Sequence, residues 1–233
     1  MSPMPTEDRI WLAALALFAR QGFAGTSTRE IADASGLTAG SLYHYMGSKD
    51  DLLEQVMLGG MTGLLEAAAA VVAATEQPPQ RLVSLVQLHV AVHARHRLEA
   101  KVVDREIEQL PPATRKRIGA MRDEYEGVWR GVVSAGIEAG DFGVADARLA
   151  TLALLGMCTE VATWFRPKGP LTPEALGLEF AQMTLSLLRA GRSGVPLTVA
   201  DLEVPAVGPF IAAYERRGGY GMVGAKAASR RGA

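Results

Sequence analysis

The spacing of hydrophobic residues predicts helices throughout the chain before residue 191. Trp11, Leu15 and Phe18 fall on one face of a first helix over Thr6–Gln21, and Gly22 ends that helix. No run alternates hydrophobic and polar residues long enough to indicate a half-buried strand. The pattern therefore predicts an all-α protein.

Capping residues mark two short helices. Ser27 and Glu30 fit a capping box, in which a hydroxyl and a carboxylate satisfy backbone amides at the start of a helix that runs to about Ser35. Thr38 can cap the next helix, over Ala39–Tyr45. These two helices are separated by Gly36, which ends the first of them at low cost.

A second capping box, Ser48–Asp51, opens a long helix over Lys49–Ala74. Prolines and glycines then separate the other helices. They are expected over Gln80–Arg95, Leu98–Gln109, Ala113–Ala139, Asp146–Phe165 and Thr172–Ala190. From Gly191 onward Gly, Pro and Ala are in excess, with a helical turn or two at most over Phe210–Arg216, so residues 192–233 are expected to be a peripheral or partly disordered extension.

Composition and charge exclude several classes of protein. The 233 residues are 48% hydrophobic and 21% charged, which is typical of a globular chain. The lone cysteine, Cys158, forbids an intrachain disulfide and fits a reducing compartment. The run Ile10–Ala19 follows acidic rather than basic residues, unlike a secretory signal, and the uncharged stretch Leu149–Thr159 is too short to span a membrane. We therefore expect a cytoplasmic protein without a membrane span.

The two short helices and their turn have the geometry of a helix-turn-helix, which places its second helix in the major groove of DNA. Thr38, Ser41 and Tyr43 can face outward, where hydroxyls and phenols bind phosphate oxygens, and Lys49 adds a cation. Residues 1–50 nevertheless carry four Lys and Arg against five Asp and Glu. A plain helical hairpin with half-buried tyrosines fits the spacing equally well.

The same region resembles a known family. Residues 19–23, 26–32, 36–45 and 48–53 are similar to the amino-terminal signature of the TetR family of bacterial transcriptional regulators, and the resemblance is contiguous over about Arg9–Val56. Met46 stands where many members have phenylalanine. The resemblance implies a homodimeric repressor that a small molecule releases from palindromic double-stranded operator DNA. It implies DNA contacts from Thr28, Arg29, Thr38, Ala39, Gly40, Ser41, Tyr43, Tyr45 and Lys49.

The later helices resemble a TetR subgroup that senses acyl-CoA thioesters in fatty-acid or steroid catabolism. The similar segments are Asp104–Glu106, Tyr125–Trp129, Glu138–Phe142, Leu155–Met157 and Trp164–Leu171. The resemblance implies a helix-turn-helix DNA-binding domain over residues 1–50 and a helical-bundle ligand-binding and dimerisation domain over 51–191. It implies an acyl-CoA effector, and the candidate ligand-binding residues are His93, Arg122, Tyr125, Trp129, Met157, Trp164 and Arg166.

The last two long helices are candidates for an intersubunit four-helix bundle, because their hydrophobic faces are broad enough to need a partner. On the first helix this face includes Leu149, Leu152, Leu155 and Gly156, and on the second it includes Phe180, Met183, Thr184 and Leu187.

Other residues have two interpretations each. His89, His93 and His96 share a helical face, where they hold a metal, line a pocket or form a plain helical surface or interface. They make only half a metal site, so we expect no metal and no cofactor. Cys158 is a core residue or a redox sensor, and Trp129 and Trp164 are core residues or line a ligand cavity.

Basic residues outside the helix-turn-helix are also open to two interpretations. The run Arg115–Arg117 is a solvated face or attracts CoA phosphates. The tail cations Lys226, Arg230 and Arg231 keep the end of the chain soluble or form a DNA-binding arm.

The chain has no Gly-x-Ser-x-Gly motif and no glycine-rich phosphate loop, so we expect no enzyme. The alternative function is a helical lipid or acyl-CoA binding protein without DNA activity.

Overall fold

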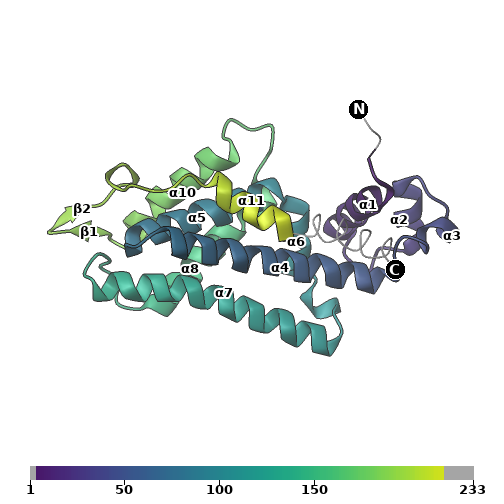
Figure 1. The fold of residues 1–233 in the computed structure, drawn as a ribbon, viewed down its shortest axis with the longest axis horizontal. Coiled ribbons are helices and arrows are strands. Elements are labelled where there is room, and N and C mark those ends of the chain that lie inside the picture. The colour runs from purple at the N-terminus through teal and green to yellow at the C-terminus, as the bar shows by residue number, and fades with distance from the viewer. Residues whose placement is uncertain (1–3, 218–233) are drawn as a thin grey trace. The chain divides into compact units, whose positions relative to one another are not determined.

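The computed structural model describes residues 4–217, and helices make up nearly all of the regular structure in this range (Figure 1). The prediction of an all-α protein is confirmed. The described residues also include a short antiparallel hairpin, in which Gly191 pairs with Pro196 and Arg192 with Val195. The elements are α1 (Thr6–Gln21), α2 (Thr28–Ser35), α3 (Ala39–Leu42), α4 (Lys49–Ala74), α5 (Pro78–Arg95), α6 (Arg97–Arg105), a 3-10 turn η1 (Ile107–Gln109), α7 (Pro112–Glu138), α8 (Ala147–Thr159), α9 (Val161–Trp164), α10 (Pro173–Leu187), β1 (Gly191–Arg192), β2 (Val195–Pro196), η2 (Val199–Asp201) and α11 (Gly208–Arg217).

Most helices begin and end within a few residues of the predicted limits, and three depart from them. In place of the helix predicted over Leu98–Gln109, α6 ends at Arg105 and is followed by the 3-10 turn η1. The helix predicted over Asp146–Phe165 is divided into α8 and α9. At the division the Glu160 carbonyl accepts hydrogen bonds from the Thr163 amide at 2.9 Å and the Thr163 hydroxyl at 2.7 Å. These bonds compete with a regular helical ladder. The helix predicted over Ala39–Tyr45 ends at Leu42 and is followed by turns.

The chain folds into two compact units, each built from separate stretches of sequence. Within the described residues, unit 1 comprises residues 4–63, 98–120 and 215–217, and unit 2 comprises residues 64–97 and 121–214.

Unit 1 contains α1, α2 and α3, which Figure 1 shows together at the purple end of the chain. Trp11 and Phe18 of α1, Ile31 of α2 and Leu42 of α3 are almost completely buried. The Phe23 ring, in the connection between α1 and α2, lies 5.3 Å from that of Phe18. Short helices are marginal in water, so this apolar core is what stabilises them.

Unit 2 is built around α5, which is buried along nearly its whole length. It packs against α8, α9 and α10. The contact with α10 is close at Gly177, where an added Cβ would lie 3.2 Å from the Cα of Gln87. α5 is buried although it carries polar residues, and the buried polar residues are Ser84, Gln87, His89 and His93.

Residues 192–217 are more closely integrated than the expected peripheral extension. Arg192 donates to Asp141 at 3.2 Å and to Gln77 at 3.1 Å, so the hairpin is tied to the body of unit 2. Phe210, Ile211 and Tyr214 of α11 are buried. A helical turn or two was expected over Phe210–Arg216, and the structure has the longer helix α11 there. The tail cations Lys226, Arg230 and Arg231 lie outside the described residues.

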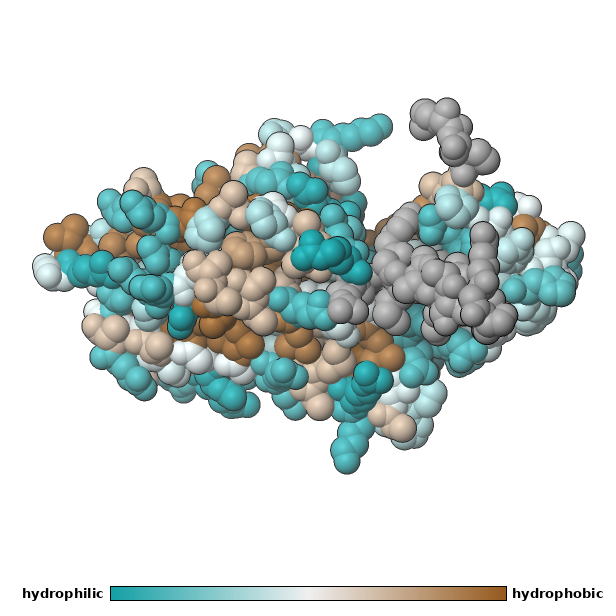
Figure 2. All heavy atoms as spheres, in the orientation of Figure 1, coloured by the Kyte–Doolittle hydropathy of each residue, from teal (hydrophilic) through white to brown (hydrophobic). Residues whose placement is uncertain are grey.

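One helix, α4, is long and apolar enough to cross a membrane by length and composition, a property that we did not expect from the sequence. In the structure 56% of its most apolar window is buried, and hydrophobic residues are visible at the surface along α4 in Figure 2. A core helix of a soluble protein has the same length and hydropathy, so this feature is weak evidence for a membrane span.

Candidate functional site

The helix-turn-helix is fixed by local capping and by a small core. The capping box of Ser27 and Glu30 is present, and Gly36 ends α2 with a φ of 70°, in the left-handed region that favours glycine. The Thr38 hydroxyl accepts from the Ser41 amide at 3.2 Å and caps α3. These contacts orient α3 while its one buried side chain, Leu42, faces inward.

The surface of this unit presents most of the predicted DNA contacts to solvent. Tyr43 and Tyr45 are 58% and 45% exposed, which is unusual for tyrosines in a folded domain. An added Cβ at Gly40 would meet nothing within 4 Å, so the backbone there is open to a partner. The exposed members of the predicted set are Arg29, Thr38, Ala39, Gly40, Tyr43 and Tyr45, and the half-buried members are Thr28, Ser41 and Lys49.

Lys49 has partners inside the protein. Its Nζ donates to the carbonyl oxygens of Phe23 and Thr26, at 2.8 and 2.7 Å, and lies 4.0 Å from the centroid of the Phe23 ring. These contacts within the protein could not be predicted from the sequence, because Thr26 and Phe23 lie 23 and 26 residues away from Lys49.

The start of α2 carries a second polar network. Gln21 donates to Glu30 at 3.0 Å, and the Ser27 amide and hydroxyl each donate to Glu30 at 2.8 Å. The bonds from Gln21 and from Ser27 lower the pKa of the Glu30 carboxyl to about 2. Glu30 is therefore a charged residue that holds α2 against the end of α1.

Unit 2 contains a polar cluster in its core. The ring of His89 lies between two hydroxyls, with Nδ1 at 3.0 Å from Tyr125 Oη and Nε2 at 3.1 Å from Thr159 Oγ1. The His93 ring stacks on it at 3.9 Å between centroids, and Trp129 meets it edge-on at 5.6 Å. The cluster joins α5, α7 and α8.

Burial keeps the His89 ring and the Tyr125 hydroxyl uncharged. Desolvation and the neighbouring His93 lower the pKa of His89 well below its usual value, and burial raises the pKa of Tyr125. A neutral imidazole has one donor and one acceptor nitrogen, so it can bond both hydroxyls at once. The nearby Trp129 indole N–H is fully buried and can donate to the Tyr125 oxygen.

The structure brings together three of the seven predicted ligand-binding residues, His93, Tyr125 and Trp129. It adds His89 and Thr159, of which only His89 has a signal in the sequence, its spacing from His93. The remaining four do not join this cluster: Arg122 and Met157 are half-buried, and Trp164 and Arg166 are exposed. Trp164 is 50% exposed and its ring lies 6.1 Å from that of Phe180.

The structure also bears on the alternative interpretations of the histidines, of Cys158 and of the run Arg115–Arg117. No group of three or more His, Cys, Asp and Glu within residues 4–217 is arranged to hold a metal ion. Cys158 is fully buried, and burial raises the pKa of its thiol to about 12, as fits a core residue. Arg115 pairs with Glu108 at 2.9 Å, while Lys116 and Arg117 are exposed.

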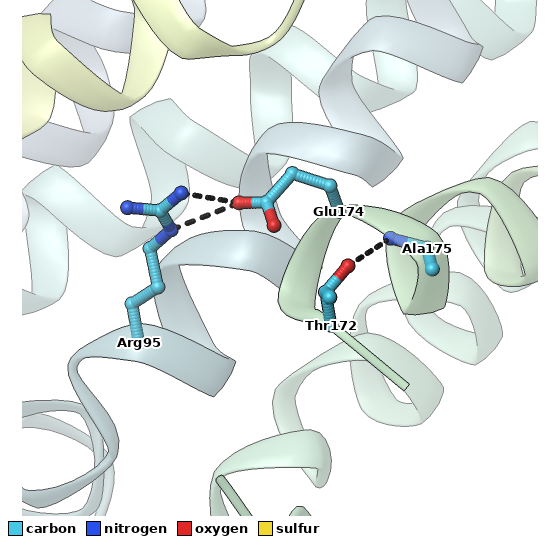
Figure 3. Close-up of polar contacts among 4 residues, drawn as sticks. All are labelled: Arg95, Thr172, Glu174 and Ala175. Atoms are coloured by element: carbon cyan, nitrogen blue, oxygen red, sulfur yellow. Dashed lines mark hydrogen bonds and ion pairs between the residues drawn. The ribbon is translucent and has the colours of Figure 1, made fainter. Parts of the chain in front are cut away.

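The end of α5 is joined to the start of α10 by an ion pair. The Arg95 guanidinium donates to Glu174 from two nitrogens, and the Thr172 hydroxyl accepts from the Ala175 amide at 3.1 Å and caps α10 (Figure 3). Partial burial would raise the pKa of Glu174, but the bonds from Arg95 and other donors outweigh it and the pKa is lowered. This junction fixes the loop that precedes α10.

Two helices of unit 2 leave hydrophobic side chains uncovered. On α8 the exposed stripe consists of Leu149, Leu152, Ala153 and Gly156, and on α10 it consists of Leu178, Met183 and Leu187. The predicted face on α10 is therefore partly wrong. Phe180 and Thr184 are buried within the subunit because α10 is hydrophobic on both sides, and periodicity alone does not choose between them.

Two family models match the chain. Residues 10–56 match the model described as bacterial regulatory proteins, tetR family, and residues 75–188 match the tetracyclin repressor-like, C-terminal domain. The first range contains the whole helix-turn-helix, and the second contains the buried cluster and both uncovered stripes.

Known proteins resemble the chain over most of its length. It is 28% identical to the HTH-type transcriptional repressor KstR2 of Mycobacterium tuberculosis, over 74% of this chain and 87% of that protein. It is 30% identical to the TetR family transcriptional regulator PfmR from Thermus thermophilus, with a TM-score of 0.69 over 79% of this chain and all of that one. It is 27% identical to AibR, solved in complex with isovaleryl coenzyme A and operator DNA, with a TM-score of 0.67 over 77% and 97% of the two chains.

Proposed function

The chain belongs to the TetR family of bacterial regulatory proteins, and from this premise we propose that it is a dimeric repressor that a CoA thioester releases from its operator. The observation that carries the proposal is the helix-turn-helix, which matches the family over residues 10–56 and presents two tyrosines to solvent. A DNA-binding regulator of transcription acts where the DNA is, so we place the protein in the cytoplasm.

We assign the DNA-facing surface to residues at the start of α2 and around α3. Thr28, Thr38, Tyr43 and Tyr45 supply hydroxyl groups for phosphate oxygens. Arg29 is an exposed cation that can reach base edges. The backbone at Ala39–Ser41 can approach the duplex closely, because Gly40 has open space around its Cα.

We assign the subunit interface to the uncovered stripes on α8 and α10. Monomeric proteins rarely expose contiguous hydrophobic patches, and two such helices from each of two subunits form a four-helix bundle. An added Cβ at Gly156 would meet nothing within 4 Å, which allows the partner's backbone to approach. A two-fold dimer then requires an operator with two-fold symmetry.

The nature of the effector is supported by the relatives. AibR was solved with isovaleryl coenzyme A together with operator DNA, and its likeness to this chain extends over the region of the buried cluster. Within the cluster, the Trp129 indole and the neutral His89, Tyr125 and Thr159 can bind an uncharged oxygen, such as a thioester carbonyl, but cannot stabilise a carboxylate by charge. This supports a thioester rather than a free fatty acid.

The competing proposal is a helical lipid or acyl-CoA carrier without DNA activity. The two are separated by selecting binding sites for the full-length protein from a random double-stranded DNA library. Our proposal predicts enrichment of an inverted repeat whose half-sites lie about one helical turn apart. Absence of enrichment by a protein that binds acyl-CoA would establish the carrier instead.

A further inference from the structure

The helix-turn-helix carries few cations for a region that binds a polyanion. Residues 10–56, which match the tetR family model, contain three Lys and Arg against five Asp and Glu, a net charge of −2. Four of these acidic residues are exposed, namely Glu30, Asp33, Asp50 and Asp51. Affinity for duplex DNA of any sequence depends on cations that neutralise phosphates. Cations from another part of the chain would therefore strengthen DNA binding.

The last part of the sequence has the charge that the helix-turn-helix lacks. Residues 216–233 contain five Lys and Arg and no Asp or Glu, and no other stretch of 18 residues has five cations without an acid. The cations are Arg216, Arg217, Lys226, Arg230 and Arg231. This stretch lies beyond residue 188, where the match to the second family model ends. It is therefore an addition to the domain that the family shares.

Helix α11 leads this basic stretch to the unit that holds the helix-turn-helix. Phe210, Ile211 and Tyr214 anchor α11 by burial, and the Tyr214 ring lies 5.2 Å from that of His96 at the end of α5. Residues 208–214 belong to unit 2, whereas residues 215–217 belong to unit 1, together with α1, α2 and α3. The residues that follow α11 therefore start from the DNA-binding unit.

The basic stretch is also long enough to follow a DNA backbone. Residues 218–233 lie outside the described residues, and 16 residues of extended chain can span up to about 50 Å. This is about twice the length of α1, which at about 1.5 Å per residue is roughly 24 Å long. We propose that residues 216–233 are a DNA-binding arm, whose cations neutralise phosphates beside the half-site that the same subunit reads. The proposal rests on the DNA-binding function proposed above.

The arm predicts a distinctive change in DNA binding when its charge is removed. Phosphate contacts carry no sequence information, so their loss should lower affinity for the operator and for a random duplex by the same factor. The loss should also reduce the salt dependence of binding, because fewer counterions are released. A stretch that only keeps the protein soluble would change neither quantity.

The test compares the full-length wild-type protein with an arm variant and a control variant, each of which loses three cations. The arm variant combines Lys226→Gln, Arg230→Gln and Arg231→Gln. Arg216 and Arg217 are kept, because cations in the last turn of a helix also stabilise it. The control variant combines substitutions of three exposed cations of unit 2, Arg130→Gln, Arg148→Gln and Lys168→Gln.

Binding to the selected operator and to a random duplex is measured by fluorescence anisotropy over a range of salt concentrations. For the arm variant we expect the slope of log K against log salt to fall in magnitude by at least about 1.8, which is about 0.9 for one phosphate contact in each of two subunits. The operator-to-random ratio should stay as in the wild type. The control variant should keep the wild-type slope. A charge-conserving variant, Lys226→Arg with Arg230→Lys and Arg231→Lys, should keep it too.

Three results would overturn the arm. The first is a wild-type slope in the arm variant, and the second is an equal fall in the arm and control variants, which is a general effect of net charge. The third is a lower operator-to-random ratio without a change of slope. Absence of a specific operator, with a random-duplex slope that still depends on the arm, would refute the proposed repressor and leave the arm intact. A wild-type protein that binds no duplex at low salt would refute both.

Lysine footprinting of the wild-type protein tests the arm without any substitution. The full-length protein is treated with an amine-reactive ester, with and without random duplex, and modification of Lys226 and Lys168 is measured by mass spectrometry. We expect DNA to slow the modification of Lys226 at least about fivefold, because its ammonium is held by phosphate, and to leave Lys168 unchanged. Equal modification of Lys226 with and without bound DNA would overturn the arm.

Discussion

His89 is a buried histidine, and binding a second proton to its ring would cost free energy. It is buried between Tyr125 and Thr159, and its bonds to their hydroxyls need one donor and one acceptor nitrogen. A second proton would remove the acceptor and bury a charge next to His93. The neutral ring is therefore part of the packing of α5 against α7 and α8.

This placement predicts a pH dependence of stability. Desolvation and His93 lower the folded pKa of His89 below the usual value of 6.5. The unfolded state therefore binds a proton that the folded state does not, and the free energy of unfolding should fall as pH drops through about 6.5, by at most about 1.4 kcal/mol per pH unit for one proton. Urea unfolding from about pH 7.5 to 5.5 measures this.

The matched variants are His89→Gln and His44→Gln. His44 is exposed beside α3, so its replacement should leave the pH dependence of unfolding as in the wild type. In His89→Gln the dependence should become weaker. An equal dependence in all three proteins would show that His89 takes up its proton in the folded state.

Tyr43 is the clearest probe of the DNA surface, because most of its side chain is exposed. Tyr43→Phe removes only the hydroxyl. Since a hydrogen bond to a charged group contributes about 1.5–3 kcal/mol, we expect at least about a tenfold loss of affinity for operator and random duplex alike, with an unchanged thermal midpoint. Anisotropy and circular dichroism measure the two. Wild-type affinity would remove Tyr43 from the proposed interface.

At the scale of the element, α8 and α10 show where sequence periodicity succeeds and fails. Of the face predicted on α8, Leu149, Leu152 and Gly156 are exposed and Leu155 is half-buried. On α10 hydrophobic residues occupy both faces, so Phe180 was assigned to the wrong side. Caps, prolines and glycines act on adjacent residues, which explains why the limits of α1 and α4 were predicted from the sequence.

The two candidate sites also differ in how far they can be predicted from the sequence. The helix-turn-helix is formed by residues close together in the chain, and its signature is readable from them. The buried cluster joins residues 36 and 70 positions apart, and no local pattern places Thr159 beside His89. The partners of Lys49 were missed for the same reason.

The uncovered stripes predict that one charge on either helix disrupts the dimer. Each leucine is present twice in a two-fold interface, and burial of each stabilises by about 1.5–3 kcal/mol. Leu152→Glu and Leu187→Glu should therefore sediment as monomers at concentrations where the wild-type protein is a dimer. Asp123→Lys, a charge change on an exposed position of α7, is the control and should remain dimeric. Wild-type dimer affinity in both glutamate variants would exclude this interface.

At the scale of the whole molecule, the proposed function requires the effector and the operator to act against each other. A ligand shifts a protein between two states only by its different affinity for them, and the coupling is reciprocal. α4 is one continuous helix that contributes Lys49–Gly63 to unit 1 and residues 64–74 to unit 2. It is the element through which we expect the coupling to act.

The most direct test of the account is a pair of titrations of the full-length protein with acyl-CoA thioesters of increasing chain length, with and without the selected operator. We expect at least one thioester to weaken operator binding about a hundredfold, which corresponds to about 2.7 kcal/mol, and the operator to weaken binding of that thioester by the same factor. The matching free fatty acid should have no effect. Equal thioester affinity with and without operator, or release by the free acid alone, would contradict the account.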